Sequence, residues 1–507
     1  MALARTRSVT LTGVDGHLVE VEVDLADGLP GLTMVGLPDA VLHEARDRIR
    51  SAVTNSGEAW PARRITIALS PAALPKRGSL LDTALAVAVL AAAGAVPADP
   101  LAAVVLLGEL ALDGRLRPTA GMLPAVLAAA RGGVRRVVVP EPNAPEAALV
   151  PDVDVRGAER LADLIAFLRG EADRLVVGRP GAASARTSHQ DLADVAGQAA
   201  GRRAVEVAAA GGHHLFLAGP PGAGKTMLAE RLPGILPPLD DAPALEVTAV
   251  HSIAGLIGAG APLVRQPPYQ APHHTASMAA LVGGGSRIAG PGAISLAHRG
   301  VLFLDEAPEF ARGVLDAMRQ PLERGEVVIA RSGGQVRFPA RFQLVLAANP
   351  CPCASPGGDV DCACTPMARR RYLSRLSGPL LDRIDLHVWL LPVTAADLLG
   401  DSLAAESSEI VAKRVVEARH AAAERLAGTA WRANAEVPGT ALRSRWRLPS
   451  RVTALADEAL HGGWLGARGY DRVLRIAWSL SDLGGRTSPD ADDIAEAVGL
   501  RSRLVAA

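Results

Sequence analysis

The segment that most constrains this chain is residues 219–226, which read GPPGAGKT. They follow an apolar run, 214–218, that predicts a buried strand, and a helix is expected to open at Lys225. Such a turn directs backbone N–H groups and the positive end of a helix dipole at one point, where phosphate groups bind. We therefore predict an ATP site; the alternative is a glycine-rich turn without nucleotide. Its predicted residues are Gly219, Pro220, Pro221, Gly222, Ala223, Gly224, Lys225 and Thr226.

Roles within this turn follow from the side chains. Lys225 supplies a charge for the β- and γ-phosphates, and Thr226 a hydroxyl ligand for Mg²⁺. A second apolar strand, 301–304, ends at two carboxylates. Asp305 is predicted to hold Mg²⁺, and Glu306 to activate a water for attack on the γ-phosphate. Solvated acids at a strand end are the alternative to this pair.

A third apolar strand, 342–348, ends at Asn349, whose amide is predicted to orient the same water. We therefore expect ATP hydrolysis rather than nucleotide binding alone.

Length and hydropathy set the broad class. With 507 residues the chain is expected to hold about three domains. No apolar stretch is long and continuous enough to span a membrane, and the N-terminus lacks a secretory pattern. We expect a cytoplasmic protein without a membrane partner.

The charge balance limits how nucleic acid could bind. The net charge is +0, so DNA contacts must come from local basic patches. The densest patch, 369–371 with Tyr372 and Arg375, either binds phosphates or forms a solvated or subunit-contact face.

All 4 cysteines are clustered, as Cys351, Cys353, Cys362 and Cys364. In an intracellular chain such clustering favours a metal site over disulfides. Four thiolates can surround Zn²⁺ as a tetrahedron, so we predict a zinc site. Reduced loop thiols are the alternative.

The chain is predicted to fold as an α/β unit (1–170), a linker (171–190), an ATPase core (191–393) and a helical lid (394–507). The core is expected to be a doubly wound parallel sheet. A long loop is expected at 251–300 and a hairpin at 326–338. Other expected elements are a hairpin at 9–23, strands at 64–69, 104–108 and 137–139, and helices at 40–56, 82–93, 123–130, 410–426, 451–460 and 471–483.

Several segments together resemble one family, among them QAPHHTASMAALVGGG, GPGAISLAHRGVLFLDEAPEF, AANPCPC and SGPLLDRIDLHV. Nearly the whole chain is similar to the YifB/ComM family of magnesium-chelatase-like AAA+ ATPases. The resemblance implies an AAA+ core in a hexameric ring. It implies that Arg383 is an arginine finger acting on the neighbouring subunit's nucleotide. It also implies that Arg468 contacts nucleotide in its own chain, with Arg472 or Arg475 as substitutes.

The N-terminal unit resembles the proteolytic domain of Lon proteases. The position of the catalytic lysine in that domain falls on Leu123, and a Ser–Lys dyad needs that amine. We therefore expect a non-proteolytic unit that binds DNA or packs around the ring. Ser79 is interpreted as the N-cap of the following helix.

The family resemblance implies a ring motor on branched or single-stranded DNA, as a helicase or branch-migration enzyme of recombination or transformation. Arg287, Arg331 and Arg337 are the candidate DNA contacts in its pore. The alternative is an ATPase subunit that remodels a partner protein, chelatase-like or chaperone-like. His273 and His274 are interpreted as loop structure or pore contacts rather than metal ligands.

Overall fold

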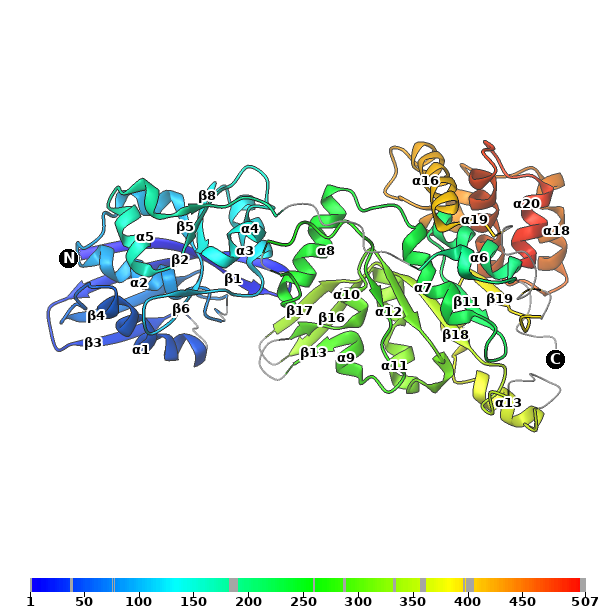
Figure 1. Cartoon of the computed structure of the whole chain (residues 1–507), viewed down its shortest axis with the longest axis horizontal. Coiled ribbons are helices and arrows are strands. Elements are labelled where there is room, and N and C mark those ends of the chain that lie inside the picture. The colour runs from blue at the N-terminus through cyan, green and yellow to red at the C-terminus, as the bar shows by residue number, and fades with distance from the viewer. Residues whose placement is uncertain are drawn as a thin grey trace.

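The computed structural model describes residues 2–36, 40–74, 76, 78–181, 190–258, 260–285, 289–331, 334–355, 362–394, 397 and 405–501. The molecule is elongated and has three parts in chain order, with the two termini at opposite ends (Figure 1). No helix within these ranges is long and apolar enough to cross a membrane.

The first part is built on an 8-stranded mixed sheet. Its strands carry buried side chains on both faces, with Val138 in one core and Val137 and Val139 in the other. In spatial order they are β10 (Val176–Val177), β9 (Asp154–Ala158), β8 (Arg136–Pro140), β5 (Val104–Leu106), β1 (Ala2–Thr12), β2 (Asp15–Ala26), β4 (Arg64–Ser70) and β3 (Gly31–Val35). The helices are α1 (Ala40–Asn55), α2 (Asp82–Ala92), α3 (Met122–Arg131), α4 (Ala144–Ala147) and α5 (Leu161–Leu168), with the short strands β6 (Glu109–Leu110) and β7 (Leu116–Arg117) beside them.

The second part is a 5-stranded sheet whose pairings are all parallel. Along β11, Leu215 and Leu217 face one core while Phe216 and Ala218 face the other, as expected for a sheet covered on both sides. The strand order is β12 (Tyr269–Gln270), β15 (Val301–Leu304), β18 (Gln343–Ala348), β11 (Leu215–Ala218) and β19 (Leu386–Trp389). The helices of this part are α6 (Ala199–Gly211), α7 (Lys225–Ile235), α8 (Asp241–Ile253), α10 (Ala293–Leu296), α11 (Arg312–Ala317), α12 (Arg319–Arg324), α13 (Pro366–Leu373) and α14 (Gly378–Leu381).

Two insertions leave this sheet on the side of the N-terminal unit (Figure 1). The first runs through α9 (Met278–Val282) and the short strands β13 (Gly283–Gly284) and β14 (Gly290–Pro291). The second is the predicted hairpin, confirmed as β16 (Glu326–Arg331) and β17 (Gly334–Pro339).

The third part is helical, as predicted for residues after the core. It contains α16 (Ser408–Arg425), α17 (Gly439–Leu442), α18 (Ser450–His461), α19 (Ala467–Leu483) and α20 (Ala491–Gly499). Val473 and Ile476 of α19 share one buried cluster with Leu217 and Val388 of the core sheet. The helical part therefore packs directly against one face of the core sheet.

Three predicted details are corrected. Residues 251–300 are not one loop, because α8 continues to Ile253 and β12 joins the core sheet as its edge strand. The predicted linker 171–190 contains β10, which pairs with β9, while residues 182–189 lie outside the described part of the chain. Ser79 is not a helix cap, since its hydroxyl hydrogen-bonds Glu109.

The N-terminal unit meets the core at α8 and the β16–β17 hairpin. The hydroxyl of Ser252, at the end of α8, donates to the buried Glu146 carboxylate. The backbone carbonyl of Ser252 accepts a hydrogen bond from Gly121 N–H at 3.1 Å. Val14, in the turn between β1 and β2, packs with Val336 of β17 and Ile253. The hairpin therefore lies between the N-terminal unit and the core sheet.

Candidate active site and metal centre

The glycine-rich turn joins β11 to α7, which opens at Lys225 as predicted. Gly222 and Gly224 have φ values of +77° and +81°, a conformation that disfavours any residue with a Cβ. A Cβ added at Gly222 would meet no atom within 4 Å, so the turn faces open space. This arrangement fits a phosphate at the start of a helix.

Lys225 lies inside this turn with only 8% of its surface exposed. Its Nζ donates to Gly219 O at 2.7 Å, Pro220 O at 2.8 Å and Asn349 Oδ1 at 3.0 Å. Burial lowers the pKa of Lys225, against the opposing effect of Asp305 and Glu306. The ammonium group has three donors, and these three oxygens occupy them, so a phosphate would take their place.

The two predicted Mg²⁺ ligands converge across the site. Thr226 Oγ1 donates to Asp305 Oδ2 at 2.7 Å, and Asp305 Oδ1 accepts from Glu306 N–H at 2.9 Å. Hydroxyl and carboxylate oxygens are the ligands that Mg²⁺ prefers. The residues present therefore fit the metal that ATP carries, and Mg²⁺ there would neutralise charge on the phosphates.

Glu306 lies just beyond β15 with φ at +48° and its side chain 49% exposed. Its Oε2 is 3.4 Å from Nδ1 of His274, which comes from the segment after β12. Asn349 lies at the end of β18 and contacts Lys225. The site thus brings together Lys225, Thr226, Asp305, Glu306 and Asn349. His274, which the sequence suggested for loop structure or pore contacts, lies beside Glu306.

Arg383, the predicted arginine finger, lies at the opposite end of the sheet strands from the glycine-rich turn. His214 and Asp385 directly precede β11 and β19, and both line a cavity of about 250 Å³. Arg383 lies on this cavity, paired with Glu323. The glycine-rich turn follows the last residue of β11, so the cavity and the turn lie at opposite ends of the strands.

Arg468, Arg472 and Arg475 of α19 line this same cavity. Arg468 Nη1 is 3.6 Å from Asp382 Oδ2. Because β11 has 4 residues, the two edges are about 13 Å apart. Arg468, which the sequence predicts to contact nucleotide in its own chain, therefore lies on the same side of the core as Arg383.

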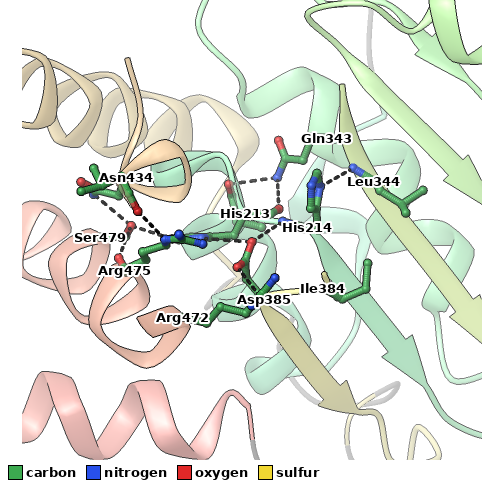
Figure 2. A network of polar contacts seen from close by, with 12 residues as sticks. His213, His214, Gln343, Leu344, Ile384, Asp385, Asn434, Arg472, Arg475 and Ser479 are labelled. Carbon is green, nitrogen blue, oxygen red and sulfur yellow. Dashed lines mark hydrogen bonds and ion pairs between the residues drawn. The ribbon is translucent and has the colours of Figure 1, made fainter. Parts of the chain in front are cut away.

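A buried polar network fixes the lid in this position (Figure 2). Arg472 Nε lies 3.2 Å from Asp385 Oδ1, and Asp385 Oδ2 accepts from His214 N–H at 3.1 Å. His213 Nε2 is 2.8 Å from Ser479 Oγ, another residue of α19. Burial would raise the pKa of Asp385, but His213 and Arg472 hold it well below its ordinary value. The charged carboxylate therefore ties α19 to the starts of β11 and β19.

The four cysteines form one cluster directly after Asn349. Their sulfur atoms all lie within 4.8 Å of one another, and Cys351 is buried. Sγ of Cys362 is 3.3 Å from Sγ of Cys351 and 3.5 Å from that of Cys353. Zn–S bonds of about 2.3 Å place tetrahedral sulfurs about 3.8 Å apart, so the cluster fits a zinc ion. A backbone hydrogen bond from Cys364, followed by contacts with Cys351, lowers the pKa of the Cys362 thiol to about 6.

The DNA-contact candidates are placed only in part. Arg337 is an exposed residue of β17 whose Nη1 lies 3.4 Å from Glu326 Oε1 on the paired strand. Arg287 and the side chain of Arg331 lie outside the part of the chain that the structure describes. Leu123, at the position of the Lon lysine, is fully buried in an apolar cluster.

Three sequence families match the chain. "Magnesium chelatase, subunit ChlI" matches residues 191–398, "Subunit ChlI of Mg-chelatase" residues 21–143, and "Magnesium chelatase, subunit ChlI C-terminal" residues 405–501. A Lon protease of Rhizobium meliloti is 30% identical over 167 residues, which is 31% of this chain and 20% of that protein. The predicted fold class is confirmed: a Lon-protease-like α/β unit, an AAA+ core with a doubly wound parallel sheet, and an all-α lid.

Similar proteins extend over the full length. An uncharacterized protein of Mycobacterium tuberculosis is 55% identical over 502 residues, 99% of each chain. Competence protein ComM of Haemophilus influenzae is 42% identical over 511 residues, 99% of this chain and 98% of that one. YifB of Escherichia coli is 42% identical over 503 residues, 99% and 97% of the two chains. The chain therefore belongs to the YifB/ComM family of magnesium-chelatase-like AAA+ ATPases.

Proposed function

We propose that this protein is an ATP-hydrolysing ring motor, and that it moves DNA strands as a helicase or branch-migration enzyme. The ring is supported by the separation of two predicted parts of the nucleotide site within one chain. The turn with Lys225 and the cavity with Arg383 lie at opposite edges of one rigid sheet. A neighbouring copy can place its Arg383 end of the sheet against the Lys225 end of this copy. Repetition of that head-to-tail contact closes a ring, which we propose to have six copies.

Within each shared site the residues have separate tasks. Lys225 and Thr226 bind the phosphates and Mg²⁺, Asp305 holds the metal, and Glu306 takes a proton from the attacking water. Arg383 of the neighbouring copy stabilises charge on the transferred phosphoryl group, and Arg468 lies beside it on the same edge. Asn349 accepts a hydrogen bond from Lys225 in this structure. When a phosphate takes the place of Asn349 on Lys225, the Asn349 amide orients the attacking water.

The DNA substrate is supported by the name of ComM, a competence protein, and by the two insertions of the core. A motor must grip DNA without sequence preference, so its contacts are phosphate contacts from local basic residues such as Arg337. Binding is therefore expected to weaken steeply as salt rises.

The test is a branch-migration assay with the purified protein, Mg²⁺ and ATP on a four-way DNA junction. The expected result is ATP-dependent conversion of the junction to duplex products, with no conversion by Lys225→Ala. Absence of any DNA binding at low salt with ATP present would instead support the remodelling of a partner protein.

We also propose that Cys351, Cys353, Cys362 and Cys364 hold one structural Zn²⁺ ion. The geometry of the four sulfur atoms supports it. The ion would brace the segment that follows Asn349.

A further inference from the structure

The helical lid presents a basic surface that has no part in the nucleotide site. Residues 443–451 contain Arg443, Arg445, Arg447 and Arg451, and no aspartate or glutamate. All four arginines are exposed. They lie in the connection from α17 to α18 and in the first turn of α18. We call these four residues the arginine patch.

The apolar residues between these arginines turn them outward. Leu442 and Leu448 are buried in the cluster that the lid shares with the core sheet, and Trp446 packs against that cluster. Because the apolar side chains face inward, the arginines that alternate with them face solvent. The guanidinium group of Arg445 lies over the Trp446 ring, 4.8 Å from its centroid, and this contact holds Arg445 at the surface.

The charge of the patch is not balanced by the chain. Elsewhere in the lid, carboxylates pair with arginines such as Arg414, Arg425 and Arg486. Within the patch, Arg443 pairs with Asp471. Among the residues that the structure describes, no carboxylate or carbonyl oxygen binds the other three guanidinium groups. The first turn of α18 contains no acidic residue, and the helix dipole there adds positive potential.

We infer that the arginine patch binds the phosphate backbone of nucleic acid. Exposed guanidinium groups without a counter-charge attract a polyanion, and their planar donors match the oxygens of a phosphate. The backbone is the same for every base sequence, so the contact suits a protein that binds without sequence preference. That the nucleic acid is DNA rests on the proposed function.

The patch is separate from the DNA-contact candidates of the core. The patch lies in the lid, whereas the β16–β17 hairpin lies beside the N-terminal unit (Figure 1). None of the patch residues lines the cavity that contains Arg383. Removing charge from the patch should therefore weaken nucleic-acid binding without changing the nucleotide site.

The test measures binding of the full-length protein to labelled DNA, duplex and single-stranded, by fluorescence anisotropy over a series of salt concentrations. The variant combines Arg445→Ala, Arg447→Ala and Arg451→Ala. We expect its affinity at about 0.1 M salt to fall by at least about tenfold. Its plot of log affinity against log salt should be shallower by about 2 to 3, because each lost phosphate contact removes about 0.9 from the slope. Basal ATP hydrolysis and the sedimentation of the assembled protein should not change.

Two control variants separate charge from position. Replacement of the same three arginines by lysine retains the charges and should keep the salt slope of the wild type. Replacement of Arg46, Arg50 and Arg131 by alanine removes three exposed arginines from the N-terminal unit and should leave binding unchanged.

Three results would overturn the inference. The patch has no role if its alanine variant binds DNA like the wild type. It acts only through net charge if the control in the N-terminal unit weakens binding equally. It is a contact between copies if its alanine variant fails to assemble while its affinity for DNA is unchanged. Wild-type protein that binds no DNA at low salt would reject the proposed function together with the patch. Wild-type protein that binds DNA through the patch without moving strands would reject only the motor.

Discussion

At the scale of single residues, the catalytic assignment depends on Glu306. Glu306→Gln preserves the shape and removes the base, so we expect nucleotide to bind normally while turnover falls by about a hundredfold or more. Nucleotide binding by fluorescence titration and phosphate release measure the two effects separately. Glu309→Gln, a nearby carboxylate paired with Arg375, is the control and should retain activity. Wild-type turnover in Glu306→Gln would show that another group activates the water.

His214 predicts a pH dependence of stability. Its Nδ1 accepts from Leu344 N–H at 3.0 Å, so the ring is neutral in the fold. Burial lowers its pKa from 6.5 to about 4, with Arg472 adding to the effect and Asp385 opposing it. Between these values the unfolded chain binds the proton and the native chain does not. Stability from this residue is therefore complete above pH 6.5 and is lost as pH falls towards 4.

The size of this effect is at most about 3 kcal/mol, and less because the ring reaches the cavity on one side. Urea unfolding at pH 5 and pH 8, followed by tryptophan fluorescence, measures it. His214→Asn retains an acceptor for Leu344 N–H without titrating, so its midpoint should vary less with pH. The exposed His420→Asn should behave as wild type. An unchanged pH dependence in His214→Asn would remove His214 from this role.

Much of the site was predictable residue by residue, because glycine-rich turns and strand-ending acids are local patterns. Lys225, Thr226 and Asp305 need only the turn after β11 and the end of β15, which lie on either side of β18 in the sheet. The place of Arg468 was not predictable in this way, because it depends on how the lid docks. That docking is set by Asp385, His213 and Arg472, which are far apart in the chain. The pairing of His274 with Glu306 likewise required β12, a strand too short to show a pattern.

At the scale of elements, the cysteine cluster joins the end of β18 to α13. We expect about one zinc ion per chain in freshly purified, reduced protein, measured by elemental analysis. Cys351→Ser with Cys362→Ser should lose the ion and lower hydrolysis, because the segment after Asn349 loosens, while nucleotide still binds. Ser355→Ala, in the same loop but not a ligand, should keep the metal. Metal-free wild-type protein would leave the cysteines as reduced loop thiols.

The hairpin and the first insertion carry the DNA-contact candidates. Replacing Arg287, Arg331 and Arg337 with alanine should uncouple the motor, so strand movement falls while basal ATP hydrolysis remains. The physical reason is loss of phosphate contacts without change at the nucleotide. The control is Arg312→Ala, an exposed arginine of α11. Junction unwinding and ATP hydrolysis are measured on the same samples. If the triple variant unwinds junctions normally, these arginines have a structural role and do not contact DNA.

The elements themselves were largely predictable. Long amphipathic segments such as α16 and α18 follow from periodicity, and the buried, largely apolar strands β15 and β18 follow from their composition. Short edge elements were missed for a physical reason: β10 and β12 have 2 residues each, and only their partners make them strands. The segment 251–300 was predicted to be a loop because its short elements show no helical or strand periodicity of their own. They are stabilised by packing against other parts of the chain.

At the scale of the whole molecule, the opposite placement of Lys225 and Arg383 predicts a site shared between copies. Each copy offers a phosphate edge to one neighbour and an arginine edge to the other, a head-to-tail arrangement. Lys225→Ala and Arg383→Ala should each be inactive alone, the first from loss of phosphate binding and the second from loss of transition-state stabilisation.

Mixing these two inactive variants should restore part of the ATP hydrolysis. An interface between a Lys225→Ala copy and an Arg383→Ala copy, in one of the two orders, combines an intact turn with an intact arginine. The recovered rate should rise and fall with the mixing ratio, with its maximum near equal amounts. Co-assembly is checked by a tag on one variant, and a mixture of Lys225→Ala with Lys225→Ala,Arg383→Ala is the control that must stay inactive. If co-assembled mixtures recover no activity, Lys225 and Arg383 act on the same nucleotide within one chain, contrary to their placement at opposite ends of the strands.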